Sequence, residues 1–202
     1  MKEKKIINDR IKRMELEEFL AKTFARAGYS RCHIQPTALA TRIIIFAQKP
    51  GIIIGRSGKT VDMLTETIKN KFGIENPQLE IEEVENPFLD AQIVANYISS
   101  AIERGLNYKR VAHMVLENTM DAGAVGIAIK IGGKIGGAMA RVEKFSAGYM
   151  KWSGDPAHTL VQKAYARAQV KLGTIGIQVR ILTKLPEAVD INEKEGIKKA
   201  IG

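Results

Sequence analysis

The amino-acid sequence predicts an α/β protein of the segregated α+β type, built from two domains. Apolar residues recur at helical spacing in some segments and alternate with polar residues in others, so both helices and half-buried strands are expected. A polar stretch that ends in Asn86 and is followed by Pro87 interrupts this pattern near the middle of the chain. We therefore place one domain over residues 1–85, a second over 86–185, and a charged surface tail over 186–202.

The first domain is expected to have the order helix, strand, strand, helix, strand. Gly28 and Gly73 stand where glycines end helices. The segment RIIIFA is β-branched and aromatic, so we expect it to be central in its sheet. The expected elements are a helix over 7–27, strands near 32–35 and 42–47, a helix over 59–72 and a strand over 79–84.

The second domain is expected to open with two packed helices, with Asn86 as the helix N-cap and Pro87 at the first helical position. Strict alternation of apolar and small or polar residues then predicts strands over 125–131 and 175–181. Between them, the segment GGKIGG turns the chain and a basic strand passes through Arg141. The region 159–172 fits either a strand or a helix. We expect these strands to form a mixed β-sheet.

Charge indicates the class of partner. The 202 residues hold 31 Lys and Arg against 22 Asp and Glu, a formal net charge of +9. Residues 86–202 contribute +6 (16 basic, 10 acidic) and residues 1–85 contribute +3 (15 basic, 12 acidic). A basic excess of this size is typical of nucleic-acid binders, although an acidic membrane surface or plain solubility would also explain it.

Several function classes are disfavoured. No stretch reaches the roughly 18 consecutive apolar residues of a membrane span, and the start MKEKKIINDR is charged where a secretory signal is apolar, so we expect a cytoplasmic protein. Cys32 is the only cysteine, which excludes an internal disulfide and a multi-thiolate zinc site. The three histidines show no metal-ligand spacing. We expect no catalytic residues, no metal, no cofactor and no small-molecule substrate.

The segment IIIGRSGKT, residues 52–60, resembles the end of a phosphate-binding P-loop, but its spacing does not fit. A P-loop requires glycine at the position occupied by Ile53, whereas the glycine is Gly55. What remains is a GxxG turn from Gly55 to Gly58, followed by Lys59 and a helix. Glycines and a helix N-terminus favour close approach of a phosphate, as in RNA-binding KH modules. A tight structural turn would explain the same glycines.

The same segment, within the order helix, strand, strand, helix, strand, resembles a type II KH domain. The segments VGIAIKIGGKIGGAMARVEKF, DPAHTL and TIGIQVRIL resemble the C-terminal domain of the S-three family of small-subunit ribosomal proteins, and they occur in the family's order. The similarity covers nearly the whole chain and is closer to archaeal and eukaryotic members. It implies a structural constituent of the small ribosomal subunit, bound to ribosomal RNA and neighbouring proteins in the subunit head, where messenger RNA enters during translation.

The resemblance also implies a role for the second helix of the helix pair. The family places two basic residues and, three positions after the second of them, a third basic residue along the messenger path, where they are linked to separating paired messenger strands. Lys109 and Arg110 match, but the third position is His113, which offers less fixed charge because an ordinary imidazole is mostly neutral at pH 7. From the residues alone, Lys109 and Arg110 could equally be the solvated face of an amphipathic helix.

Basic residues on or beside the expected strands of the second domain complete the predicted RNA-binding surface, because basic groups release condensed counterions on binding. Trp152 lies near them and either stacks on a base or packs in a core or protein interface. A free-standing KH regulator that binds single-stranded RNA is the alternative function. The expected RNA-binding residues are Gly55, Arg56, Ser57, Gly58, Lys59, Lys109, Arg110, His113, Lys130, Lys134, Arg141 and Lys144.

Overall fold

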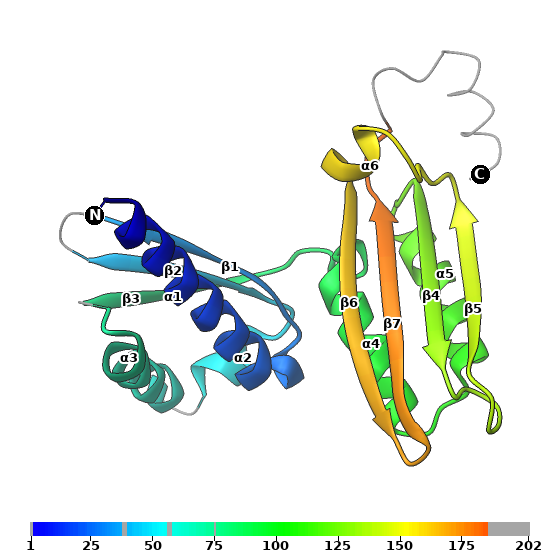
Figure 1. The fold of residues 1–202 in the computed structure, drawn as a ribbon, viewed down its shortest axis with the longest axis horizontal. Coiled ribbons are helices and arrows are strands. Elements are labelled where there is room, and N and C mark those ends of the chain that lie inside the picture. The colour runs from blue at the N-terminus through cyan, green and yellow to red at the C-terminus, as the bar shows by residue number, and fades with distance from the viewer. Residues whose placement is uncertain (1, 38–39, 56–57, 75, 186–202) are drawn as a thin grey trace. The chain divides into compact units, whose positions relative to one another are not determined.

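A computed structural model describes residues 2–37, 40–55, 58–74 and 76–185, and Figure 1 shows its fold. The chain divides into two compact units, Met1–Glu85 and Asn86–Gly202, which we describe separately. The expected surface tail over 186–202 lies outside the described residues.

The first unit follows the predicted order with one additional helix. Pro50–Ile54, where the sequence pattern predicts no element, forms the short helix α2: Pro50 occupies the first turn, and the side chain of Ile53 is 1% exposed. The helix expected over 7–27 ends at Thr23, and Gly28 instead caps a 3-10 turn over Ala25–Ala27. The remaining elements are α1 (Lys2–Thr23), β1 (Tyr29–Pro36), β2 (Thr41–Ala47), α3 (Lys59–Phe72) and β3 (Pro77–Glu83).

The sheet of the first unit has the order β1-β2-β3, so the RIIIFA segment is central, as predicted. β1 and β2 pair antiparallel, whereas β2 and β3 pair parallel because α2 and α3 carry the chain back before β3 begins. Ile43 and Ile45 of β2 are fully buried under α1 and α3, together with Leu16, Leu20 and Ile68. This core fixes the positions of α2 and α3 on the sheet.

The second unit begins with the two expected helices. Pro87 starts a 3-10 turn, Pro87–Leu89, rather than the helix itself. The N-cap is Asp90, whose Oδ1 accepts hydrogen bonds from the backbone N–H groups of Gln92 at 2.9 Å and Ile93 at 3.2 Å. The elements are α4 (Ala91–Glu103), α5 (Tyr108–Asp121), β4 (Gly126–Gly133), β5 (Arg141–Gly148), α6 (Pro156–Thr159), β6 (Val161–Val170) and β7 (Gly173–Leu182).

The sheet of the second unit has the order β5-β4-β7-β6 and is antiparallel at each pairing, not mixed as we expected. Parallel neighbours need a crossover between them, and here α4 and α5 both precede the first strand. The ambiguous region 159–172 is mostly strand β6, which forms a hairpin with β7.

Among the described residues, helices cover one face of this sheet and leave the other open. α4 packs on β6 and β7, while α5 packs on β4 and β5, so both helices lie on the same side of the sheet (Figure 1). Ile127, Ile129 and Ile131 of β4 point into this helix-covered side and are at most 1% exposed. The alternate residues of each strand therefore project from the open face.

Candidate nucleic-acid interface

The GxxG turn joins α2 to α3, and its two glycines are required by backbone conformation. Gly55 has φ 70° and ψ −172°, a region that is essentially restricted to glycine, and a Cβ atom there would collide with Oγ1 of Thr60. Gly58 precedes α3 with φ 77° and ψ −3°, in the left-handed region. The backbone therefore explains both glycines without a ligand. Arg56 and Ser57 lie outside the described residues.

The surroundings of the turn are nevertheless suited to an anion. α3 is 14 residues long, and the N–H groups of its first turn carry the positive end of the helix dipole. Lys59, its first residue, is exposed. On the other side of the turn, Ile52 and Ile54 are 51% and 43% exposed, although both are apolar. A positive helix end beside an apolar patch can contact a phosphate and a base together.

The second predicted site is the start of α5. Asn107 caps this helix by accepting a hydrogen bond from the backbone N–H of Lys109 at 2.9 Å. Lys109, Arg110 and His113 are all exposed. Lys109 and His113 are four residues apart and share one face of the helix, next to Arg110. The pattern therefore forms one exposed patch.

Two contacts fasten this patch to the sheet. The hydroxyl of Tyr108 donates a hydrogen bond to Oε1 of Glu143 on β5 at 3.0 Å. Burial, and then the bond to Glu143, raise the pKa of Tyr108. The His113 ring meets the Phe145 ring edge-on, with centroids 5.5 Å apart. The sequence pattern did not reveal these partners, because residues of α5 and β5 meet only once the sheet has formed.

The four predicted basic residues of the sheet do not form one group. Lys130 and Lys144 are direct cross-strand partners on the open face. Arg141, Glu143 and Phe145 are at every second position of β5 and therefore share one side. Arg141 thus lies on the helix-covered side at the start of β5. Lys134 lies in the connection between β4 and β5 and lines a separate hollow near Leu106. The open face thus keeps two of the four predicted cations.

The open face also carries residues that were absent from the predicted set. Trp152 is 60% exposed, so it is not a core residue, and the guanidinium carbon of Arg180 lies 5.2 Å from the centroid of its ring. Lys163 stands opposite Arg180 in the register of β6 and β7. Strand alternation could have placed these two cations on one face, but nothing local in the sequence indicates the position of Trp152.

In the part of the chain that the structure describes, no group of three or more His, Cys, Asp or Glu side chains could hold a metal ion. No helix there has the length and hydrophobicity of a membrane span.

Comparison with known proteins identifies both units. The GxxG turn between two helices on a three-stranded sheet defines the KH class, and a KH domain model matches residues 15–89. A model described as "Ribosomal protein S3, C-terminal domain" matches residues 98–181. The chain belongs to the family of small ribosomal subunit protein uS3. The α+β fold class, with a KH domain followed by the S3 C-terminal domain, is confirmed.

The relatives cover nearly the full chain. The uS3 protein of Methanocaldococcus jannaschii is 44% identical over 100% of this chain and 98% of the relative. That of Methanoculleus marisnigri is 42% identical over 96% of this chain and 84% of the relative. That of Natronomonas pharaonis is 39% identical over 95% of this chain and 64% of the relative. These relatives are archaeal ribosomal proteins and not enzymes, in agreement with the resemblance stated above.

Proposed function

We propose that this chain is a structural constituent of the small ribosomal subunit, where it binds ribosomal RNA in the subunit head and helps to form the mouth through which messenger RNA enters. The observation that carries the proposal is the match to ribosomal protein S3 across both units. The mechanism is electrostatic anchoring and recognition of RNA shape. No cofactor, membrane or small-molecule substrate is involved.

Ribosomal RNA binding is supported by the distribution of charge. Residues 86–202 carry a net +6, and the cations of the four strands are concentrated on the open face of the sheet. Each phosphate contact by Lys or Arg releases condensed counterions, so such a surface binds RNA in a salt-dependent way. Neighbouring proteins of the head are proposed to contact the remaining surface.

The role at the messenger entrance rests on α5. Lys109 and Arg110 are exposed, adjacent and fixed in position by the Asn107 cap, so they present two permanent positive charges on a rigid helix. His113 completes the patch but is held against Phe145. We assign Lys109 and Arg110 to contact with messenger RNA, and the GxxG turn to contact with an RNA backbone.

Sedimentation tests the ribosomal proposal. The tagged full-length protein is expressed in cells, and the extract is separated on a sucrose gradient. Co-migration with small subunits that persists after a high-salt wash is expected. A protein that remains at the top of the gradient and still binds single-stranded RNA would instead be the free-standing KH regulator.

A further inference from the structure

The open face of the four-stranded sheet is basic. Strand alternation and register place five cations on this face. None of the described strand residues on this face is Asp or Glu. The single acidic residue of the four strands, Glu143, lies on the opposite side with Tyr108. The cations of the open face are Lys130, Lys144, Lys163, Arg167 and Arg180.

Like charges stand directly opposite each other on this face. Lys130 pairs in register with Lys144, and Lys163 pairs with Arg180. Like charges at directly opposed positions destabilise a sheet. The described strand residues of this face include no Asp or Glu. A bound polyanion would therefore relieve the repulsion.

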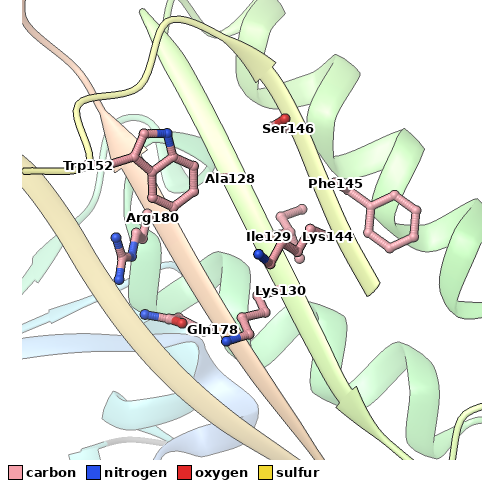
Figure 2. A pocket seen from close by; sticks show the side chains of 9 residues that line it. All are labelled: Ala128, Ile129, Lys130, Lys144, Phe145, Ser146, Trp152, Gln178 and Arg180. Carbon is pink, nitrogen blue, oxygen red and sulfur yellow. The ribbon is translucent and has the colours of Figure 1, made fainter. Parts of the chain in front are cut away.

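Two aromatic rings are held on the same face by a polar network. Tyr165 is 66% exposed and Trp152 is 60% exposed. With its amide oxygen turned toward both neighbours, Gln178 accepts hydrogen bonds from the Tyr165 hydroxyl at 3.1 Å and from Nη2 of Arg180 at 3.2 Å. Arg180 in turn lies against the Trp152 ring, as Figure 2 shows. The network fixes both rings without covering them.

Two adjacent hollows lie between these side chains. The first, of about 190 Å³, is bounded by Trp152 and Arg180 on one side and by Lys130 and Lys144 on the other (Figure 2). The second, of about 250 Å³, lies beside Tyr165 and shares Lys130 and Gln178 with the first.

Glycines keep the second hollow open. Gly132 and Gly176 are register partners and both line this hollow. A Cβ at Gly176 would meet only the backbone oxygen of Gly132, at 3.8 Å, and one at Gly132 would meet only Cγ2 of Val142, at 3.4 Å. Packing therefore does not require glycine at either position. Glycine inside a strand often marks a site that a ligand approaches closely.

We propose that the open face binds an unpaired RNA segment, with bases stacked on Trp152 and Tyr165 and phosphates contacting the surrounding lysines and arginines. A nucleotide combines a flat base with an anionic phosphate. This face offers aromatic rings for the base and cations for the phosphate. The RNA must be unpaired because the bases of a duplex are not free to stack on protein side chains. The inference rests on the proposed function, that this chain binds RNA.

Trp152 is the only tryptophan of the chain, so its fluorescence reports on this face alone. The full-length protein is titrated at low salt with an oligouridylate of about 12 nucleotides. We expect saturable quenching of tryptophan fluorescence and, for Trp152→Ala, an affinity about tenfold weaker by anisotropy of labelled RNA. Trp152→Phe should retain most of the affinity. Leu172→Ala, which truncates a similarly exposed apolar side chain in the turn between β6 and β7, is the matched control.

Gly176→Thr provides a second, independent variant. Threonine favours strands and fits the space, so thermal stability should be kept or raised while the hollow is filled and oligouridylate affinity falls several-fold. Unchanged fluorescence at saturating RNA, or wild-type affinity in both Trp152→Ala and Gly176→Thr, would overturn the inference. If these RNA-binding tests fail but the protein still co-sediments with small subunits, the proposed function stands and only the assignment of the open face is lost.

Discussion

The ring of His113 on α5 meets the ring of Phe145 on β5 edge-on, with 5.5 Å between centroids and 79° between planes. The third position of the basic pattern therefore contributes a contact to the sheet, whereas Lys109 and Arg110 remain exposed toward solvent. The charge of the patch therefore comes from Lys109 and Arg110, whereas its contact with the sheet involves His113. Substitutions can change either property without changing the other.

Replacing Lys109 and Arg110 with Ala should slow translation through a messenger hairpin several-fold more than translation of an unpaired messenger. The reason is that the two exposed charges would no longer hold separated strands. Ribosomes carrying the variant are assayed on matched reporters with and without the hairpin. Lys12→Ala with Arg13→Ala, an adjacent exposed pair on α1, is the control. Equal slowing on both reporters would confine Lys109 and Arg110 to assembly.

His113→Arg should add charge and remove the ring contact at once. We expect faster passage through the hairpin but a loss of about 0.5–1.5 kcal/mol from the free energy of unfolding of the second unit, the usual value of an aromatic pair. His113→Phe keeps the edge-on contact without the charge and should preserve stability. Chemical denaturation and the hairpin reporter measure the two effects. If both variants have wild-type stability, the Phe145 contact contributes nothing.

Gly55→Ala should destabilise the first unit by about 1–3 kcal/mol, because Ala is strained at this backbone conformation and its Cβ would displace Thr60. Gly51→Ala is the matched control: a Cβ there has no neighbour within 4 Å, and the residue lies in α2. Circular dichroism during thermal unfolding compares the two. Similar melting temperatures would show that the GxxG turn tolerates a side chain.

Cys32 should resist alkylation in the folded protein. Its side chain is buried, and burial raises the pKa of the thiol above its ordinary value. The neutral thiol is therefore favoured by folding, so its contribution to stability is fully present below the ordinary thiol pKa of about 8.5 and is lost as the pH rises from there through the raised pKa of the folded protein. Iodoacetamide labelling should be roughly 1,000-fold slower than in urea. Equal rates would contradict the buried position.

Asp90→Ala should lower the free energy of unfolding of the second unit by about 1 kcal/mol, since the backbone N–H groups of Gln92 and Ile93 would lose their acceptor. Asp90→Asn keeps an oxygen at the cap and should cost little. Urea denaturation measures the free energy of unfolding of both variants. A large loss in the Asn variant would mean that the charge of Asp90, and not its capping oxygen, stabilises the unit.

Much of the fold could be predicted from local pattern, because burial imposes a period of two or of 3.6 residues on each segment. This held for the central strand β2 and for the alternating strands β4 and β7. It failed for α2, where five residues are too few to show a period, and for the pairing of the second sheet, which depends on partners far apart in the chain.

The candidate sites divide in the same way. The GxxG turn and the Lys109-Arg110 pair are local in sequence and could be found there. The grouping of Trp152 with Arg180 and Tyr165 depends on the register between β6 and β7 and on the path of the chain after β5. The predicted cations Lys134 and Arg141 lie apart from Lys130 and Lys144 because Lys134 belongs to the β4–β5 connection and Arg141 faces the opposite side of β5.

β7 is the last strand of the second sheet, yet it lies between β4 and β6. During synthesis the first sheet can close as soon as β3 has emerged, while β4 must wait for the segment Gly173–Leu182. Until then the apolar edge of β4 has only β5 as a partner and can pair with other chains. The first unit can therefore fold before the second. A chain arrested before Gly173 would carry a folded KH domain attached to an incomplete, aggregation-prone sheet.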